Sequence, residues 1–282
     1  MKCFYHNDLD GECSAAIVRK KFGSNKIDEY IPMDYSKDIP FDDIGNGESV
    51  VIVDFSFQKD GDFEKLFGIT DDVIWIDHHK TSIEKHYPKF KIVDGIRGEG
   101  GKSNPAGCLL TWNFFFDVEA PKAVKLISDY DSWTYSMKDT AMFKMGMDCI
   151  NTDPITGNWI HLFNGNIESI IEIGIHAEAY KKKYYANLIK GLSFKVEFEG
   201  FTGIACNAAY VNSTLFDTVE KTDLMLPFYF NGEQFTVSIY SVNDKIDCSE
   251  IAKKYGGGGH KGAAGFQCKE LPFEKMWRQN ET

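Results

Sequence analysis

The stretch VIWIDHHK, residues 73–80, places four consecutive apolar residues directly before an aspartate and two histidines. A second stretch, VVIVDFSF at residues 50–57, has the same form, because its apolar run also leads into an aspartate. Continuous apolar runs of this length are typical of strands buried on both faces of a parallel sheet. The two stretches therefore predict neighbouring buried strands, at residues 73–76 and 50–55, with polar side chains where each strand ends.

Shorter apolar segments at residues 3–5 and 27–33 predict two further strands. Helical patterns alternate with these strands and follow them, at residues 12–22, 60–67, 106–116 and 120–130. Such alternation is typical of an α/β domain, here a parallel sheet with helices on both faces. We assign this domain to residues 1–165.

The rest of the chain has a different texture. Residues 166–192 are helical in pattern and become rich in Lys and Tyr from Lys181, so we expect a connecting helix. Segments 194–198 and 234–241 alternate between apolar and polar residues, and the Asn-Gly pair at 231–232 is typical of a hairpin turn. We therefore expect a smaller α+β domain at residues 193–282.

Composition excludes several classes of protein. The 282 residues are 43% hydrophobic, but no apolar run is long enough to span a membrane, and the N-terminus has no apolar stretch of signal-peptide length. The seven cysteines are scattered and never spaced as a CxxC pair, which argues against a disulfide framework and a thiolate zinc site. We expect a cytoplasmic protein without membrane association, as a monomer or homodimer.

The formal net charge of −11 bears on the partner. Long nucleic acids are bound through many phosphate contacts by Lys and Arg, so we expect no binding of long duplex DNA. A short single-stranded oligonucleotide or a small nucleotide remains possible as substrate, because bound cations reverse the sign of an acidic cluster locally.

Acidic and histidine residues gather in four places in the first domain: HNDLDG at 6–11, VDFS at 53–56, IDHHK at 76–80 and SDYD at 128–131. Three of these follow predicted strands, and ligands bind at the carboxyl ends of strands in doubly wound sheets. Carboxylates mixed with imidazoles suit Mn²⁺ better than an all-oxygen calcium cage does. The clusters therefore predict a metal site.

Two-metal phosphoryl hydrolysis needs ions about 3.5–4 Å apart and a carboxylate that they share. Asp8 and Asp10 on an extended segment, with Gly11 at the turn into a helix, would supply two carboxylates. Asp54 on the neighbouring strand would bridge the ions.

A glycine-rich stretch, GGGGHKGAAGF at residues 256–266, stands near the C-terminus. Glycines let the backbone approach an anion closely and present N–H groups to it. We expect this stretch to bind a substrate phosphate, through the following residues: Gly257, Gly258, Gly259, His260 and Lys261.

The motifs, taken together, resemble the DHH superfamily of phosphoesterases. Asp77-His78-His79 is the triplet that names the family, and it stands in the family's order after the DLDG and VD motifs. The glycine-rich stretch resembles the GGGH-x-x-AAG motif of the DHH-associated C-terminal domain. The resemblance covers most of the chain and extends to RecJ-type exonucleases, nano-RNases and cyclic-dinucleotide phosphodiesterases.

Carried over by residue, the resemblance implies ligands to two divalent ions, Mn²⁺ or alternatively Mg²⁺: His6, Asp8 and Asp54 for one, and Asp10, Asp54, His78 and either Asp129 or Asp131 for the other. We favour Asp129, because Ile127-Ser128-Asp129 better matches the family's apolar-small-Asp pattern. His79 would face the substrate phosphate and complete the catalytic set with Asp54 and His78. Asp77 would lie behind the ligands and orient one of them.

One departure affects His6. In many relatives, including family-II pyrophosphatases, the first histidine lies four residues before the first aspartate of the motif, whereas His6 lies two before Asp8. His6 is either a ligand or stands where RecJ-type exonucleases place an extra aspartate. The same spacing, with the C-terminal motif, argues against a pyrophosphatase.

Trp133 and Tyr135 follow the fourth motif. Aromatic faces of this kind stack on bases, but packing in the domain core is the interpretation we favour.

The sequence thus predicts a two-metal phosphodiesterase that hydrolyses short oligonucleotides, in the manner of an exonuclease or oligoribonuclease, or small nucleotides. A cyclic-dinucleotide phosphodiesterase or nucleotide-bisphosphate phosphatase is the alternative. A non-catalytic nucleotide sensor is the alternative from another class. Such a sensor should have lost at least one metal ligand, whereas Asp8, Asp10, Asp54 and His78 are all present in this chain.

Overall fold

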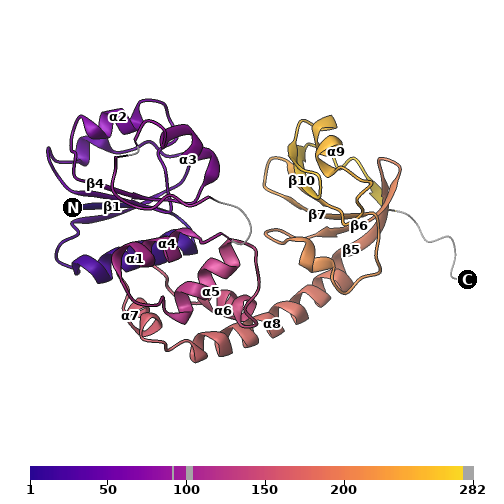
Figure 1. Cartoon of the computed structure of the whole chain (residues 1–282). Coiled ribbons are helices and arrows are strands. Elements are labelled where there is room, and N and C mark those ends of the chain that lie inside the picture. The colour runs from indigo at the N-terminus through magenta and orange to yellow at the C-terminus, as the bar shows by residue number, and fades with distance from the viewer. Residues whose placement is uncertain (91, 100–103, 276–282) are drawn as a thin grey trace, which may run out of the picture. The chain divides into compact units, whose positions relative to one another are not determined.

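The computed structural model describes residues 1–90, 92–99 and 104–275 (Figure 1). The chain divides into two compact units, Met1–Glu178 and Ala179–Thr282. The long helix α8 (Glu168–Leu192) contains the boundary between them.

The first unit contains a four-stranded parallel sheet in the order β2-β1-β3-β4. Its elements follow along the chain as β1 (Lys2–His6), α1 (Leu9–Phe22), β2 (Glu29–Met33), β3 (Val50–Val53), α2 (Asp62–Phe67), β4 (Val73–Ile76), α3 (Lys80–His86), α4 (Gly107–Phe115), α5 (Lys122–Asp131), α6 (Thr140–Met147) and α7 (Asn158–Phe163). In the register of the sheet Tyr5 pairs with Val53, and Val53 with Ile76. The three strands β1, β3 and β4 therefore end at the same edge.

Both faces of this sheet are covered by helices, as predicted (Figure 1). On one face α1, α4 and α5 bury a core that includes Ile17, Leu126 and Val53. On the other face α2 and α3 cover a second core, which includes Phe63 and Trp75. Burial on both sides explains why β3 and β4 are continuous apolar runs.

Element ends differ from prediction where the site begins. β4 has the predicted bounds, but β3 ends at Val53 because Asp54 takes a left-handed conformation, with φ 54°. Helix α1 starts at Leu9, three residues early, with Asp8 as its N-cap. The expectation that Asp10 lies on an extended segment is therefore wrong, since Asp10 belongs to the first turn of α1. Helices α3, α6 and α7 were not predicted.

The second unit contains a sheet in the order β11-β5-β6-β7-β8-β10-β9, in which only the β6–β7 pair is parallel among the described residues. Its elements are β5 (Ser193–Phe198), β6 (Phe201–Asn207), β7 (Leu224–Phe230), β8 (Phe235–Tyr240), α9 (Cys248–Lys254), β9 (Gly258–His260), β10 (Ala263–Cys268) and β11 (Glu274–Lys275). The smaller α+β part is thus present, and β7 and β8 flank the Asn-Gly pair at 231–232 as expected of a hairpin, although β6 was not foreseen.

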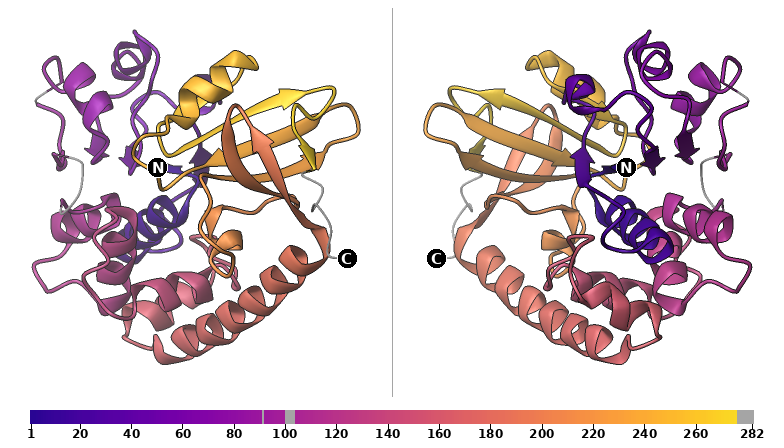
Figure 2. Two further views of the ribbon diagram at one scale, coloured as in Figure 1. Left: turned by 90° about the vertical axis from the view of Figure 1, so that its right-hand side faces the viewer. Right: turned by 90° about the vertical axis from the view of Figure 1, so that its left-hand side faces the viewer.

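Helix α9 lies over one face of this second sheet and buries Ile251 and Ala252 there (Figure 2). The other face is covered by Leu215 and Phe216, together with Leu188 from α8. Strand residues alternate between these two cores, which is the period-two pattern of a sheet covered on both faces.

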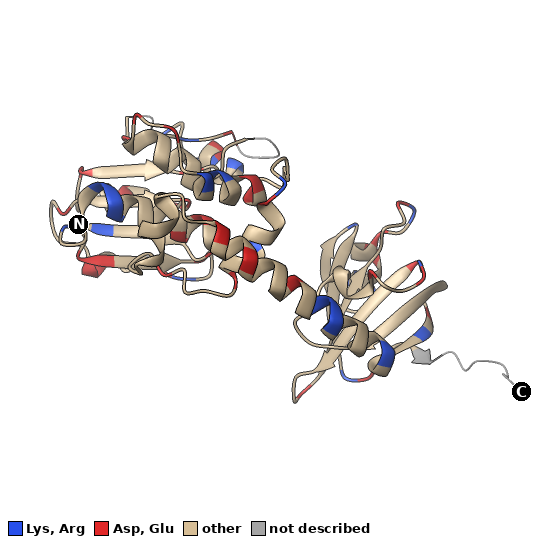
Figure 3. Cartoon of the chain, turned by 90° about the horizontal axis from the view of Figure 1, so that it is seen from below, with Lys and Arg blue, Asp and Glu red and all other residues tan. Residues whose placement is uncertain are grey.

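The two halves of α8 carry opposite charge: glutamates lie toward its first turns and lysines toward its last (Figure 3). This polarity matches the helix dipole, which favours acidic groups at the N-terminus and basic groups at the C-terminus. Among the described residues no helix combines the length and the apolar character that crossing a membrane requires.

Candidate metal centre

The shared edge of the first sheet brings three of the four motifs together. His6 is the last residue of β1, Asp54 directly follows β3, and Asp77 directly follows β4. Because parallel strands in register end side by side, motifs far apart in the sequence become neighbours. The site is a consequence of the sheet topology.

Asp54 lies at the middle of this cluster and is 1% exposed. Its Oδ2 is 3.8 Å from Nδ1 of His6, and its Oδ1 is 3.1 Å from Nε2 of His78. Neither carboxylate oxygen accepts a hydrogen bond from residues 1–90, 92–99 or 104–275. The two oxygens of Asp54 thus face two different histidines.

Potential ligand atoms lie within 4.8 Å of one another in three groups: His6, Asp8 and Asp54; Asp10, His78 and Asp131; and Asp54, His78 and His79. In the first group, Nδ1 of His6 is 2.7 Å from Oδ2 of Asp8. In the second, Nε2 of His78 is 3.7 Å from Oδ2 of Asp10 and 3.5 Å from Oδ2 of Asp131. Asp54 lies between the first two groups.

The electrostatics of the cluster call for a cation. Burial raises the pKa of Asp54 well above its usual value, and the neighbouring Asp10 and Asp8 raise it further. Burial, again with Asp10 and Asp8, raises the pKa of Asp131 to about 7. Ionised carboxylates that are buried without partners are costly, whereas a bound divalent ion stabilises them. The residues present therefore fit a divalent metal ion.

Asp10 is held by backbone groups at the start of α4. The amides of Gly107 and Cys108 donate to its two oxygens at 2.7 and 2.8 Å. A Cβ at position 107 would lie 2.6 Å from Cβ of Asp54, so this glycine also makes room for the central carboxylate. Gly107 was not recognised in the sequence, since no local pattern marks a glycine whose contact is with a distant part of the chain.

Asp77 lies outside the three groups and orients the histidines that follow it. Its Oδ1 accepts from the amides of His78 and His79, at 2.8 and 3.1 Å, and lies 2.7 Å from Nδ1 of His79. Its Oδ2 accepts from the hydroxyl of Ser56. Burial alone would raise the pKa of Asp77, but these partners lower it overall.

The pKa of His79 is raised. Burial acts to lower it, but the hydrogen bond to Asp77 and the charges of Asp77, Asp10 and Asp131 outweigh that effect. His79 is therefore more readily protonated than an ordinary histidine near neutral pH.

Of the two candidates in the fourth motif, Asp131 lies in the cluster and Asp129 does not. The carboxylate of Asp129 accepts from the amide and hydroxyl of Ser136, at 2.8 and 2.7 Å, from the amide of Met137 at 3.1 Å, and from the hydroxyl of Thr140. These bonds lower its pKa against the effect of burial. The sequence pattern favoured Asp129, but helix α5 turns that side chain into the loop after it.

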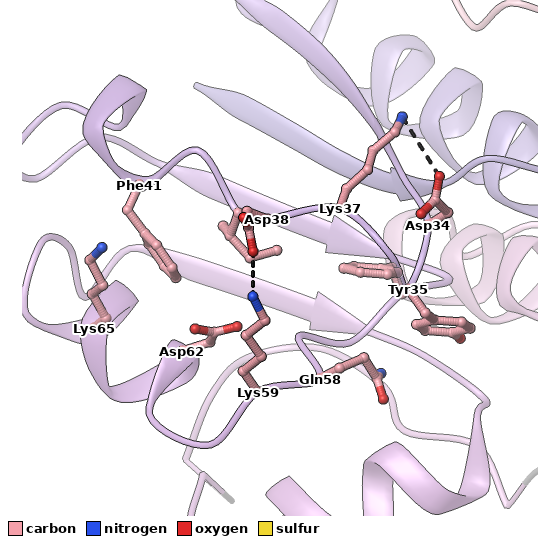
Figure 4. A pocket seen from close by; sticks show the side chains of 11 residues that line it. Asp34, Tyr35, Lys37, Asp38, Phe41, Gln58, Lys59, Asp62 and Lys65 are labelled. Atoms are coloured by element: carbon pink, nitrogen blue, oxygen red, sulfur yellow. Dashed lines mark hydrogen bonds and ion pairs between the residues drawn. The ribbon is translucent and has the colours of Figure 1, made fainter.

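Tyr35 forms one side of the cluster and was not foreseen. Its ring lies 5.3 Å from that of His6 and 5.9 Å from that of His79, and it stacks on Phe55 at 5.6 Å. Tyr35 and Phe55 also line a pocket of about 240 Å³. Figure 4 shows its charged side chains, where Lys59 reaches Asp38 and Lys37 points to Asp34.

A cavity of about 320 Å³ lies on another side of the cluster. Its lining includes the carboxylates of Asp8, Asp10 and Asp131 together with Tyr130 and Lys144. Trp133 and Tyr135, which follow the lining residue Asp131 in the sequence, are 67% and 43% exposed. The expectation that these two rings pack in the core is therefore wrong.

The glycine-rich stretch belongs to the second unit. Gly258, Gly259 and His260 form β9, and Lys261 lies in the turn into β10; both His260 and Lys261 are exposed. A Cβ on Gly257 would lie 2.1 Å from the carbonyl oxygen of Gly265, so close strand packing already requires that glycine.

A comparison with known protein families finds no match. Two curated proteins are similar over nearly the whole chain. An uncharacterised protein of Acanthamoeba polyphaga mimivirus is 27% identical over 304 residues, covering 95% of this chain and 68% of the relative. The oligoribonuclease NrnB of Bacillus subtilis (strain 168) is 21% identical over 299 residues, covering 96% and 73%.

Among solved structures, the pGpG-specific phosphodiesterase PggH from Vibrio cholerae is similar with a TM-score of 0.60 and 15% identity, over 95% of this chain and 93% of that one. The DHH domain of a member of a family of ribosomal proteins is similar with a TM-score of 0.50 and 14% identity, over 94% and 81%. Both likenesses concern the fold.

The ordered motifs meet at one edge of a parallel sheet, their side chains fit a divalent metal, and the fold is that of a known DHH protein. In fold, the chain is therefore similar to proteins of the DHH superfamily of phosphoesterases.

Proposed function

We propose that the protein is a two-metal phosphodiesterase that cleaves short single-stranded oligonucleotides or small nucleotides. The observation that carries the proposal is Asp54, a buried carboxylate without hydrogen-bond donors among the described residues, whose two oxygens face two groups of ligands. A carboxylate placed between two ion sites is what two-metal hydrolysis requires.

The groups in the structure suggest how the ligands divide. His6, Asp8 and Asp54 would hold one ion, and Asp10, Asp54, His78 and Asp131 the other. The position of His6 favours the ligand role over the alternative suggested by its spacing. The mixture of carboxylates and imidazoles favours Mn²⁺, with Mg²⁺ as the alternative. Divalent ions at these sites supply charge that stabilises phosphoryl oxygens and lowers the pKa of water.

His79 would act on the substrate phosphate. Asp77 fixes its ring through Nδ1, which leaves Nε2 as the free donor of the imidazolium. The raised pKa of His79 favours the charged form of this donor. A charge-assisted hydrogen bond from Nε2 would stabilise charge on a phosphoryl oxygen.

The substrate class is supported by the relatives and by the charge of the chain. One relative is an oligoribonuclease, and one similar structure is a phosphodiesterase specific for pGpG. In the second unit, the exposed His260 and Lys261 beside Gly257, Gly258 and Gly259 would bind a terminal phosphate. The net charge of −11 again favours compact substrates over long duplexes.

Product analysis with Mn²⁺ tests the proposal. The panel contains 5′-labelled RNA and DNA from dimer to decamer, cyclic dinucleotides, a nucleotide bisphosphate and pyrophosphate. Asp54→Asn, which keeps the shape and removes the charge, is compared with Asp60→Asn, a matched change at an exposed aspartate. Mn²⁺ binding is measured by calorimetry on each protein.

We expect cleavage of short oligonucleotides, reduced at least about 100-fold in Asp54→Asn and unchanged in Asp60→Asn. Cleavage of only the cyclic or bisphosphate substrates would select that alternative. A wild type that binds Mn²⁺ and nucleotide but cleaves nothing would contradict the proposal and indicate a sensor.

A further inference from the structure

Three aromatic side chains form a cluster that begins in the fourth motif, at Tyr130, and continues past it with Trp133 and Tyr135. The ring of Trp133 stacks near that of Tyr130 at 6.4 Å, and Tyr135 lies 5.9 Å from both. Trp133 is 67% exposed, which is unusual for the largest apolar side chain when no function requires it. Burial of apolar surface therefore does not explain why Trp133 stands at this position.

The backbone holds the two outer rings in a costly conformation. Trp133 has φ 54° and Tyr135 has φ 48°, a left-handed region that bulky residues rarely adopt. The carbonyl of Asp129 accepts from the amides of Thr134 and Tyr135, at 3.1 and 3.3 Å. Together with the carboxylate bonds of Asp129, these contacts fix the loop. Strain maintained at an exposed position is typical of functional sites.

The cluster adjoins the metal centre. Tyr130 and Asp131 line the same cavity as Asp8 and Asp10, so the candidate ligand carboxylates and an aromatic ring share one cavity. Lys144, also in the lining, lies over the Tyr130 ring at 5.1 Å and pairs with Asp148 at 2.7 Å. The exposed rings of Trp133 and Tyr135 therefore contact this cavity's wall through Tyr130.

We propose that Trp133 and Tyr135 form a stacking platform for a nucleobase of the substrate. The inference rests on the proposed function, because it requires the phosphate of the same nucleotide at the metal centre. Stacking uses the π-face that every base presents, so the platform favours substrates with a base without selecting which base. Sugar phosphates and pyrophosphate would lack this contact.

Kinetics on matched substrates test the platform. Trp133→Ala, Tyr135→Ala and Trp133→Phe are assayed with Mn²⁺ on a dinucleotide and on the same dinucleotide with an abasic sugar at either position. Tyr180→Ala, a change at an exposed aromatic residue on α8, is the control. We expect Trp133→Ala to raise KM for the dinucleotide about 10-fold, with less effect for Trp133→Phe and none for Tyr180→Ala.

The KM values for the abasic substrates decide whether the platform exists. If the platform exists, the wild type already has a raised KM for one of them, and Trp133→Ala adds nothing further on that substrate. Equal losses on the dinucleotide and on both abasic substrates would overturn the inference, as would unchanged kinetics in Trp133→Ala and Tyr135→Ala.

A binding measurement separates this inference from the proposed function. A phosphorothioate dinucleotide that resists cleavage is titrated into the wild type and Trp133→Phe while tryptophan fluorescence is recorded. We expect quenching in the wild type that is absent in Trp133→Phe and with the abasic analogue. Quenching without turnover of any substrate would support the platform while contradicting hydrolysis. The same fluorescence change in both proteins would overturn the platform even where hydrolysis is found.

Discussion

At the scale of the residue, the site is built around a carboxylate in an unfavourable setting. Asp54 is buried, has a left-handed backbone with φ 54°, and accepts no hydrogen bond within the described ranges of the chain. A left-handed non-glycine residue costs about 1–3 kcal/mol, and the buried charge adds to that cost. The fold tolerates Asp54 because neighbouring residues, Gly107 in particular, shape the space around it.

Gly107 provides a residue-scale prediction. In Gly107→Ala the new Cβ would lie 2.6 Å from both Cβ and Oδ1 of Asp54, so the carboxylate must move. We expect Mn²⁺ affinity and activity to fall at least about 10-fold. Gly157→Ala is the control, because nothing lies within 4 Å of a Cβ there. Calorimetric Mn²⁺ titration of both variants provides the measurement, and equal affinities would contradict the prediction.

The two aspartates of the fourth motif provide a second prediction at the scale of the residue. Asp131→Asn removes a charge from the Asp10, His78 and Asp131 group, so we expect Mn²⁺ affinity to fall at least about 10-fold with little loss of stability. Asp129→Asn should leave Mn²⁺ affinity within a few-fold of wild type, since its carboxylate faces the loop. Parallel Mn²⁺ titrations decide between them, and the reverse order of effects would restore Asp129 as the ligand.

At the scale of the element, strand ends and helix starts place the ligands. Three parallel strands that end together bring His6, Asp54 and Asp77 to one edge, and the start of α4 supplies two amides to Asp10. The N-terminus of a helix presents free amides to a carboxylate, and the start of α4 uses two of them to position Asp10. The loop after α5 is similarly fixed by one carboxylate, that of Asp129.

Removing the loop's anchor tests this element. Asp129→Ala leaves the amides of Ser136 and Met137 and the hydroxyl of Thr140 without their acceptor. We expect the free energy of unfolding to fall by about 1–3 kcal/mol, because partners of a buried acceptor lose their hydrogen bonds. Urea denaturation followed by circular dichroism measures the loss. A loss below about 0.5 kcal/mol would show that the loop is held by other contacts.

At the scale of the whole molecule, each unit has its own core, but only the first contains the clustered carboxylates and imidazoles among the described residues. Metal binding should therefore act on the stability of the first unit. Ligands that bind the native state alone stabilise it by RT ln(1 + [L]/Kd), about 2.7 kcal/mol at a hundred times Kd.

The metal effect should depend on pH in a defined direction. In the metal-free protein the pKa values of Asp54, Asp131 and His79 are raised above their unfolded values. Groups with raised pKa values stabilise the fold at low pH and lose that contribution as pH rises through the folded pKa, which for Asp131 is about 7. The lowered pKa values of Asp8 and Asp77 matter only below about pH 4.

We therefore expect the thermal midpoint of EDTA-treated protein to fall between pH 5 and pH 8. Because Mn²⁺ binds ionised carboxylates, the increase in midpoint that it produces should be larger at pH 8. Scanning calorimetry at the two pH values, with and without Mn²⁺, measures both effects. In metal-free Asp131→Asn the thermal midpoint should fall less steeply with pH than in the wild type. An equal dependence of the midpoint on pH in both proteins would contradict the assignment of the raised pKa to Asp131.

The sequence alone determined the fold class and which motifs the sheet brings together at the candidate site. Apolar runs before Asp54 and Asp77 predicted buried parallel strands. Such runs can be recognised in the sequence because a strand that is buried on both faces has no position for a polar side chain. Their polar ends predicted which residues meet, since parallel strands end at a common edge. These are properties of local pattern and of the general geometry of sheets.

Only the tertiary structure decided the contacts that depend on packing between distant elements. The direction in which α5 turns Asp129 and Asp131, the need for a glycine at 107, and the exposure of Trp133 all follow from how helices pack on the sheet. A side chain's direction on a helix changes by about 100° per residue, so neighbouring carboxylates in one motif face different surroundings. No local pattern could distinguish them, because the surroundings are supplied by residues far away in the chain.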